Sequence, residues 1–278
     1  MDPTSQEHAG EVSRGERFTF GANWRRFLRV LNDDRIREAE SSLRSMLGVD
    51  TLAGKRFLDI GSGSGLFSLA ARRLGATVRS MDYDPQSVAC TAELRRRYFP
   101  DDPAWTVTQG SVLDRGTVEA LGPHDIVYSW GVLHHTGDMW KALQHATLPV
   151  APGGSLFVSI YNDQGARSKA WRILKRIYCT GAPGRWFVTA LGSAYFFLVC
   201  LKEDLLRFRD PTRRYREYRK NRGMSVLHDW IDWFGGYPFE VAKVDQIFQF
   251  YHSRGFELTN LVTVGGALGC NEFVFRRK

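Results

Sequence analysis

The stretch Lys55 to Gly65, KRFLDIGSGSG, holds the residues whose types and spacing are best suited to chemistry. A short apolar run carries the acid Asp59, and glycines follow at alternate positions 61, 63 and 65. Glycine is needed where the backbone takes positive φ or where a ligand touches the main chain with no Cβ in between. An acid followed by such a turn predicts a ligand site with a place for a cationic amine.

The spacing of the glycines distinguishes two kinds of ligand. A dinucleotide fingerprint places its third glycine three residues after the second, so that a helix N-terminus meets pyrophosphate. Here that position is Leu66, and the third glycine stands at Gly65. The charge of Asp59 would also repel a pyrophosphate. An ordinary strand-to-helix turn with incidental glycines is the alternative that this motif alone leaves open.

The pattern resembles the first motif of class I S-adenosylmethionine-dependent methyltransferases, whose cofactor carries an ammonium, a sulfonium and no phosphate. More narrowly, the chain resembles the small-molecule group that includes ubiquinone- and menaquinone-biosynthesis methyltransferases. The resemblance implies S-adenosyl-L-methionine as cofactor and S-adenosyl-L-homocysteine as product. A second apolar run, Thr77 to Met81, ends at Asp82, 21 positions after Gly61. An acid at this strand tip is placed to accept both hydroxyls of a ribose. Asp84 precedes Pro85 and has a sufficient role as a helix N-cap.

The elements that must position these residues form an α/β pattern, because strands alternate with helices from Lys55 to Tyr161. The resemblance resumes near the C-terminus, where two apolar runs allow a reversed strand hairpin. We therefore expect a Rossmann-like, seven-stranded, mostly parallel sheet with helices on both faces and a helical lid insertion between strands five and six. The expected divisions are an N-terminal arm with helices covering the cofactor (1–50), the cofactor-binding core (51–161), the lid insertion (162–240) and the completion of the core (241–278).

The N-terminal arm has two expected parts. Residues 1–14 are polar and charged and are predicted to lack fixed structure. The aromatic stretch Phe18 to Trp24 follows, and the resemblance implies an arm folded over the cofactor with Trp24 or Phe20 against the ligand. Simple packing of this stretch on the core is an equal alternative.

The loops after strands three and four complete the predicted site. The loop Gln109 to Asp114 resembles the adenine-contacting loop of the family, with Ser111 where an acid is common. After strand four, His134 and His135 resemble a stretch in which one histidine often faces substrate, and an imidazole can accept a proton from an attacking group. Alternatively, His135 binds backbone and His134 only lines the pocket. The predicted cofactor-binding residues are Trp24, Asp59, Gly61, Ser62, Gly63, Gly65, Asp82, Tyr83, Ser111, Val112 and Trp130.

The insertion contains three notable segments. The apolar run Trp186 to Leu201 has sixteen residues, short of the ~20 that span a bilayer, and favours a buried lid helix over an interfacial membrane contact. The basic segment Arg207 to Arg222 is either a solvated helix face or a surface for an anionic substrate or phospholipid. The aromatic segment His228 to Glu240 predicts substrate contacts or core packing. Its predicted substrate-binding residues are Trp230, Trp233 and Tyr237, with His228, Asp229 and Asp232 in reserve.

Composition narrows the function classes. The four cysteines lack metal-ligand spacing, no metal cluster is evident, and the N-terminus carries no secretory signal, which together predict a cytoplasmic protein. The leading hypothesis is methyl transfer to a hydroxyl, amine or carbon of a small-to-medium acceptor that is aromatic, sugar-like or lipid-like. The net charge of +8 keeps RNA or DNA methylation open, but strand four lacks a DPPY-like tetrapeptide. A non-catalytic cofactor-binding protein is the third hypothesis.

Overall fold

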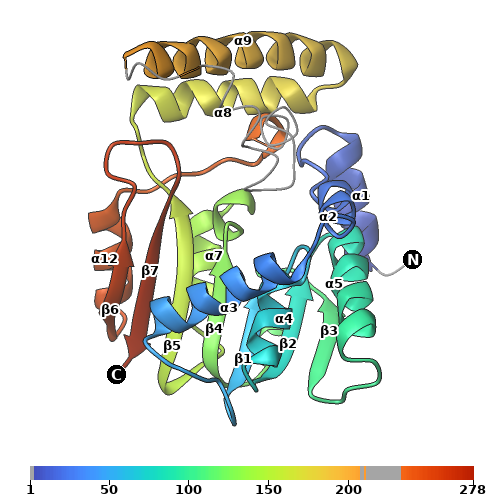
Figure 1. Cartoon of the computed structure of the whole chain (residues 1–278), viewed down its shortest axis with the longest axis vertical. Helices are drawn as coiled ribbons and strands as arrows, with labels where there is room; N and C mark the ends of the chain where they lie inside the picture. Colours follow the sequence, from blue (N-terminus) through green and yellow to red (C-terminus); the bar gives the residue numbers. More distant parts are fainter. Residues whose placement is uncertain (1–2, 207–209, 211–232) are drawn as a thin grey trace.

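A seven-stranded sheet forms the centre of the computed structural model, which describes residues 3–206, 210 and 233–278 (Figure 1). The strands are β1 (Arg56–Ile60), β2 (Thr77–Asp82), β3 (Trp105–Gln109), β4 (His124–Trp130), β5 (Val150–Tyr161), β6 (Phe256–Val262) and β7 (Cys270–Arg277). Their order is β3-β2-β1-β4-β5-β7-β6, and β7 runs in the direction opposite to the other six strands. The predicted mostly parallel sheet with a reversed hairpin at one edge is therefore confirmed.

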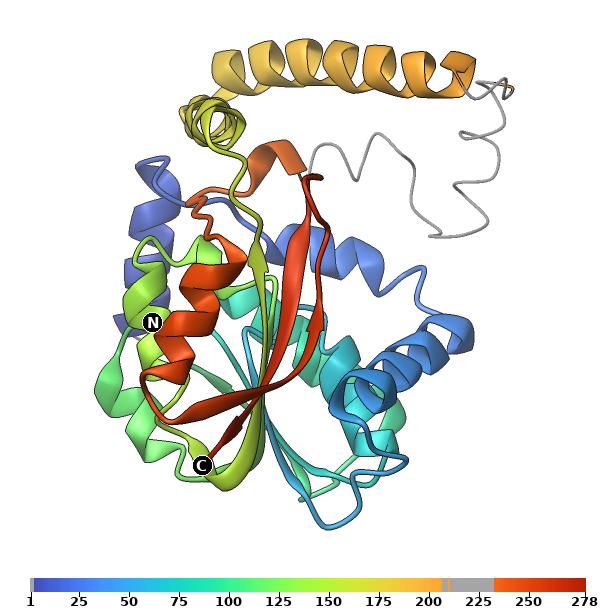
Figure 2. The same ribbon diagram turned by 90° about the vertical axis from the view of Figure 1, so that its left-hand side faces the viewer.

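Two layers of helices cover the sheet (Figure 2). The helices are α1 (Pro3–Ser13), α2 (Gly21–Phe27), α3 (Asp33–Leu47), α4 (Leu66–Arg73), α5 (Pro85–Tyr98), α6 (Arg115–Ala120), the 3-10 turn η1 (Leu133–His135), α7 (Met139–His145), α8 (Ala166–Cys179), α9 (Ala182–Leu206) and α12 (Val244–His252). Phe57 of β1 packs in a core with α3, α4 and α5, whereas its neighbour Leu58 packs in the opposite core with α6, α7 and α12. Both side chains are fully buried, as a central parallel strand requires.

Residues Pro3–Ser13 form a helix, so for this part of the chain the prediction that residues 1–14 lack fixed structure is wrong. Polar contacts attach α1 to the core. The Ser5 hydroxyl donates to the Gln109 side chain at 2.9 Å, and the His8 ring meets Tyr83 edge-on at 5.3 Å. His8 is the one buried side chain of this helix. The helix therefore has no apolar stripe from which it could have been predicted.

The chain returns to the sheet through α7 and β5. Asp138 is the N-cap of α7 and accepts from the Lys141 amide. β5 begins at Val150 and includes the Pro-Gly-Gly stretch at residues 152–154. The pairing of β5 with β4 shifts register between His124 and Ile126. The strand therefore accommodates the Pro-Gly-Gly stretch as an irregularity of the bulge type and continues beyond it.

The insertion after β5 forms a layer beyond the carboxyl ends of the parallel strands, in which α9 packs against α8 (Figure 1). Trp171, Val188 and Phe234 join α8, α9 and the following segment in a small apolar core of their own. Only a strip of α9 is buried, and Trp186 is 78% exposed, so the prediction of a buried lid helix is wrong. Within the described residues, α9 is the one helix long and apolar enough to cross a membrane by length and composition.

The predicted basic segment Arg207 to Arg222 lies outside the described residues except for Asp210. The same holds for Trp230 and for the reserve residues His228, Asp229 and Asp232.

Candidate active site

A buried acid, Asp59, and a partly buried acid, Asp82, lie where β1 and β2 end. Asp59 and Asp82 both line a cavity of about 330 Å³ at the point where the strand order reverses, and Asp59 is only 2% exposed. Burial, together with the neighbouring charge of Asp82, raises the pKa of Asp59 to about 7. Burial also raises the pKa of Asp82 to about 6. Two carboxyl groups in a desolvated site favour a ligand that brings positive charge and hydrogen-bond donors.

A chain of buried donors fixes the Asp59 carboxyl group. Ser68 donates its hydroxyl proton to Asp59 Oδ2 at 2.5 Å, and Ser68 and Ser80 hydroxyls lie 2.7 Å apart. Trp105 Nε1 donates to Ser80 at 2.9 Å. Because the Ser68 proton is committed to Asp59, Ser80 must donate to Ser68, and every donor in the chain points toward the carboxyl group. These bonds favour ionised Asp59, but desolvation is the larger effect.

The glycine turn is a cradle with no room for side chains. Gly61 has φ +81°, and a Cβ there would lie 2.3 Å from Val132 Cγ1. A Cβ on Gly63 would lie 2.9 Å from Trp24 Nε1, and the Gly63 amide donates to Asp82 Oδ2 at 2.8 Å. The backbone of the turn is thereby tied to one acid and left bare toward the cavity. These residues fit the amino-acid and ribose parts of S-adenosylmethionine, because the acids would face its ammonium and hydroxyls.

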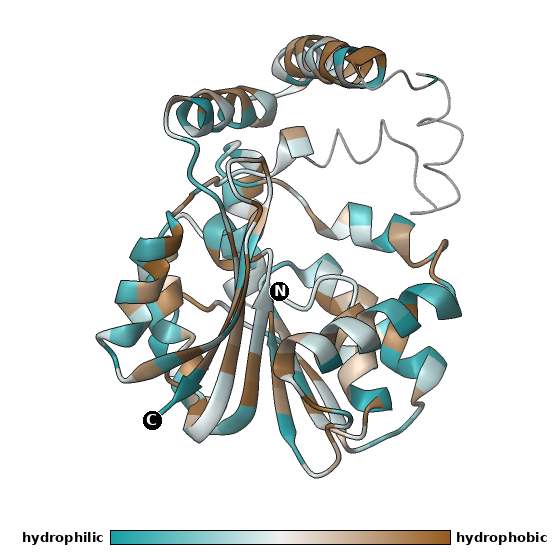
Figure 3. Cartoon of the chain, turned by 60° about the vertical axis from the view of Figure 1, so that its left-hand side comes forward, coloured by the Kyte–Doolittle hydropathy of each residue, from teal (hydrophilic) through white to brown (hydrophobic). Residues whose placement is uncertain are grey.

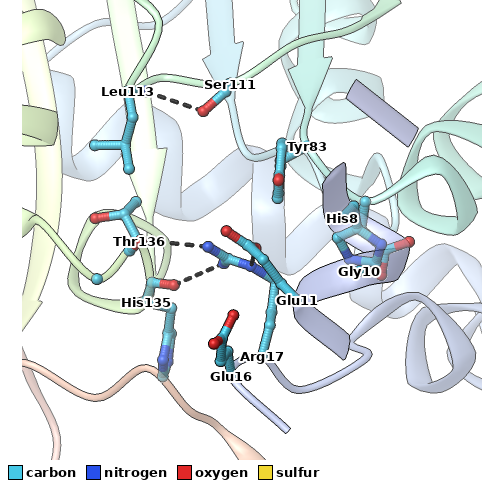
Figure 4. A network of polar contacts seen from close by, with 12 residues as sticks. His8, Gly10, Glu11, Glu16, Arg17, Tyr83, Ser111, Leu113, His135 and Thr136 are labelled. Carbon is cyan, nitrogen blue, oxygen red and sulfur yellow. Dashed lines mark hydrogen bonds and ion pairs between the residues drawn. The ribbon is translucent and has the colours of Figure 1, made fainter. Parts of the chain in front are cut away.

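The N-terminal arm closes over the cavity and is held by residues that the sequence analysis did not assign to the site (Figure 4). Arg17 lines the cavity and donates to the carbonyl oxygens of His135 at 2.9 Å and Thr136 at 3.2 Å. Its Nε donates to Glu11 at 2.5 Å. On the other side, Asp84 accepts from the Gly21 amide at 2.8 Å in addition to capping α5, so its predicted capping role is correct but incomplete.

The two adjacent histidines occupy different environments. His135 lines the cavity, and its Nδ1 lies 2.6 Å from the Pro238 carbonyl oxygen. A carbonyl can only accept, so Nδ1 carries the proton and Nε2 the lone pair. Burial lowers the pKa of His135 to about 3, with Lys175 adding to the effect. His134 is fully buried against Tyr161 at a ring distance of 4.1 Å and does not line the cavity.

With this geometry in place, comparison with known proteins decides the family. A family model described as a methyltransferase domain matches residues 29–190, which is more than half of the chain. The chain belongs to this methyltransferase family. A ubiquinone biosynthesis O-methyltransferase from Escherichia coli (strain SMS-3-5 / SECEC) is 30% identical over 185 residues, covering 64% of this chain and 67% of the relative. The predicted family, enzyme class and cofactor are therefore confirmed: the protein is an S-adenosylmethionine-dependent methyltransferase.

Solved structures share the fold of this methyltransferase. Magnesium protoporphyrin IX methyltransferase from Synechocystis PCC 6803, with bound S-adenosylhomocysteine, has a TM-score of 0.52 and 14% identity, covering 87% of this chain and 83% of that one. An O-methyltransferase family protein from Burkholderia thailandensis has a TM-score of 0.54 and 15% identity, covering 99% of this chain and 68% of that one. At such identities the likeness concerns the fold alone.

Most of the residues predicted for the methyltransferase site lie together around the cavity. The lining includes Trp24, Asp59, Gly61, Ser62, Gly63, Asp82, Tyr83, Ser111, Val112, Trp130 and His135. Gly65 does not line it; this residue has φ +81° and caps α4, where a Cβ would lie 3.0 Å from Thr91 Cα. Trp233 and Tyr237 are also outside the lining. Trp233 packs on Trp171 at 5.7 Å and over the Lys175 ammonium at 4.4 Å, so its contacts match the core-packing alternative.

Several lining residues of the methyltransferase site were missed by the sequence analysis, among them His8, Arg17, Phe27, Phe67 and Tyr128. His8 belongs to α1 and Arg17 to the segment after it, and neither stretch carries an apolar period. Phe27 is the last residue of α2. Tyr128 lies in the fourth strand, β4, whose side chains alternate between the two faces of the sheet. The sequence does not show which of these side chains lines the cavity. Within the described part of the chain, no group of three or more histidine, cysteine or acidic residues could hold a metal ion.

Proposed function

We propose that this methyltransferase transfers a methyl group to a hydroxyl, amine or carbon of a small-to-medium, largely apolar acceptor by in-line SN2 attack. The observation that carries the proposal is the division of the cavity lining. Asp59 and Asp82 form one end at the tips of β1 and β2, whereas Phe20, His135 and Trp130 come from the arm and the end of β4. A pocket with one polar and one aromatic end suits a polar cofactor beside an apolar acceptor.

The residues of the chain have distinct roles in this proposal. S-adenosylmethionine supplies, when bound, a methyl group already activated by its sulfonium. Asp59 would hold the ammonium, Asp82 would accept from ribose hydroxyls, and Ser111 would lie against the adenine. The Arg17 contacts to the η1 turn keep the arm closed and exclude water. Holding the reacting groups in line in a dry site supplies much of the acceleration without a strong base.

The environment of His135 favours an orienting role over that of a strong base. A ring with a pKa of about 3 is neutral at every physiological pH, so Nε2 can accept a hydrogen bond from an acceptor hydroxyl or amine. Proton removal by such a weak base is unfavourable, and the acceptor proton would pass to water after methylation. His134 does not itself line the cavity and is not proposed to take part in the reaction.

Variants of His135 separate orientation from folding. His135→Asn keeps a donor near the Nδ1 position for Pro238 but removes Nε2, and we expect it to lower kcat by about 10-fold to 100-fold with little change in cofactor affinity. His135→Gln should instead retain more activity and lower the melting temperature, because the bond to Pro238 is lost. The matched control His134→Phe preserves ring packing and should keep full turnover. Equal kcat for His135→Asn and the wild type would refute the orienting role.

The cavity charge argues against nucleic acid as the acceptor. Its lining contains the carboxyl groups of Asp59, Asp82 and Asp84, whereas Arg17 is paired with Glu11. Nucleic-acid binding depends on cationic groups that displace counterions from phosphates. The lining therefore supports a small-molecule acceptor.

The proposed function can be tested with the intact protein. Calorimetry should show binding of S-adenosylhomocysteine and no binding of NAD. Incubation with a methyl-labelled donor and a metabolite extract, followed by mass spectrometry, should place the label in an apolar small molecule. Label recovered only in nucleic acid or in strongly anionic metabolites would overturn the proposed acceptor class. Absence of a labelled product in every metabolite extract would also count against the proposal.

A further inference from the structure

The helix α9 exposes an apolar surface that nothing in the described structure covers. Every large apolar side chain that is at least half exposed in the described residues lies on α8 or α9: Ile173, Trp186, Phe187, Leu191, Phe197, Leu198, Leu205 and Leu206. Figure 3 shows the apolar colouring along α9 at the periphery of the molecule. A helix that is apolar around its circumference is normally buried on all sides, and large exposed apolar patches mark interaction surfaces.

One strip of this helix is already used for packing, which fixes its orientation. Val188 is fully buried, and a Cβ on Gly192 would lie 2.4 Å from Phe234 Cε1. Phe196, one turn further, stacks on Trp171 and on Phe234, each at 5.6 Å. Residues 188, 192 and 196 thus hold one face of α9 against α8 and the segment near Phe234. A membrane-spanning position would break these contacts, whereas lying on a membrane surface keeps them.

The charge around this surface indicates what kind of partner covers it. Residues 166–206, which make up α8, α9 and the link between them, contain seven lysines and arginines and two acidic residues, a net charge of +5. The whole chain carries +8, so these 41 residues hold more than half of its net positive charge. Within α8 the basic residues Arg167, Lys169, Arg172 and Arg176 are exposed, and the helix contains no acidic residue. A second copy of the chain would bring two such positive regions together, whereas an anionic surface would be attracted.

We propose that α8 and α9 form a membrane-docking surface that lies in the interface of a bilayer containing anionic lipids. Trp186, Phe187, Leu198 and their exposed neighbours enter the boundary of the acyl chains, and the basic residues of α8 face lipid headgroups. The cavity is lined by residues at the carboxyl ends of β1, β2 and β4. The helices α8 and α9 lie beyond the same ends of the strands (Figure 1). The docking inference goes beyond the proposed methyl transfer and holds for any acceptor.

Vesicle co-sedimentation of the full chain tests the proposal. We expect binding to vesicles of phosphatidylglycerol and phosphatidylcholine, much weaker binding to phosphatidylcholine alone, and partial release when NaCl rises from 0.1 to 1 M, since salt screens the headgroup attraction. The triple variant Trp186→Ser/Phe187→Ser/Leu198→Ser should lower the partition coefficient at least about tenfold, because burial of large apolar side chains drives insertion.

Matched controls keep the test specific. Trp140→Ser/Phe248→Ser/Val49→Ser removes similar exposed side chains from other surfaces and should bind vesicles as the wild type does. Arg167→Gln/Lys169→Gln/Arg176→Gln should reduce the preference for phosphatidylglycerol and its salt sensitivity. Unchanged S-adenosylhomocysteine binding establishes that each variant is folded. This measurement does not depend on whether the protein transfers a methyl group. Absence of vesicle binding, equal losses in both serine variants, or a dimer in light scattering that the α9 variant abolishes would overturn the proposal.

Discussion

Gly61→Ala is expected to weaken S-adenosylhomocysteine binding by at least about 30-fold. The new Cβ would lie 2.3 Å and 2.4 Å from the two Val132 methyl groups, at a residue with φ +81°. The left-handed conformation costs an alanine roughly 1–2 kcal/mol, and overpacking typically costs about 1–3 kcal/mol. The turn can relieve this strain only by moving from the cavity, and about 2 kcal/mol lost from binding corresponds to about 30-fold. Calorimetry together with thermal unfolding measures both effects.

Two controls separate the causes of the Gly61→Ala effect. Gly48 also has positive φ, +66°, but no atom lies within 4 Å of a Cβ built there. Gly48→Ala should therefore lose about 1 kcal/mol of stability and leave cofactor affinity unchanged. The double variant Gly61→Ala/Val132→Gly removes the clashing atoms and should regain affinity relative to Gly61→Ala, with Val132→Gly as its reference. A folded Gly61→Ala protein that binds within threefold of the wild type would contradict the cradle assigned to this turn.

The central part of the fold could be predicted because its signals are local. The apolar run of β1 and its glycine turn are contiguous in sequence, and the acid at the end of β2 follows at a fixed interval. Strands buried on both faces read as continuous apolar runs whatever lies elsewhere in the chain. The same locality explains why the lining residues from the turn and from the strand tips were assigned in advance.

The parts that could not be predicted depend on contacts between distant residues. The helix α1 is held by Ser5 and His8 against residues more than 70 positions away, so its own composition gave no reason to expect order. The donors behind Asp59 come from α4, β2 and β3, and an isolated serine or tryptophan carries no sign of such a chain.

The environment of α9 shows a different limit. The apolar composition of α9 indicates that the helix is covered, but it does not distinguish a protein core from another partner. A buried lid helix therefore fits the sequence pattern as well as a surface helix does. Likewise, adjacent histidines after β4 look alike in sequence. The η1 turn places one in the cavity and the other in the core, and burial lowers the pKa of both.

Asp59→Asn is expected to weaken S-adenosylmethionine binding by about 10-fold to 150-fold while making the ligand-free protein more stable near neutral pH. A hydrogen bond to a charged group contributes about 1.5–3 kcal/mol, and the amide retains an oxygen for Ser68 but loses the charge that would hold the ammonium. Stability changes in the opposite direction because the variant no longer places a carboxylate in a desolvated site beside Asp82. Calorimetry and thermal melts on the same samples measure the two effects.

The pH dependence gives this prediction its sharpest form. The pKa of Asp59 is raised from its ordinary value of 3.8 to about 7 in the folded protein, so its stabilising contribution is complete below pH 3.8 and is lost as pH rises toward 7. Asp82 adds a similar loss up to about pH 6. The wild type should therefore lose stability across this range, and Asp59→Asn should lose less.

Cofactor affinity should follow the opposite trend, because the ammonium requires ionised Asp59. Wild-type affinity should rise between about pH 6 and 8, around the pKa of about 7, whereas Asp59→Asn should show only the smaller rise due to Asp82. Ser68→Ala is the informative partner variant. The Ser68 hydrogen bond lowers the pKa of Asp59, so its loss should move the inflection to higher pH while the carboxyl group remains. If Asp59→Asn bound the cofactor as tightly as the wild type at pH 8, the ammonium would have to be held elsewhere, and the role assigned to the paired acids would fail.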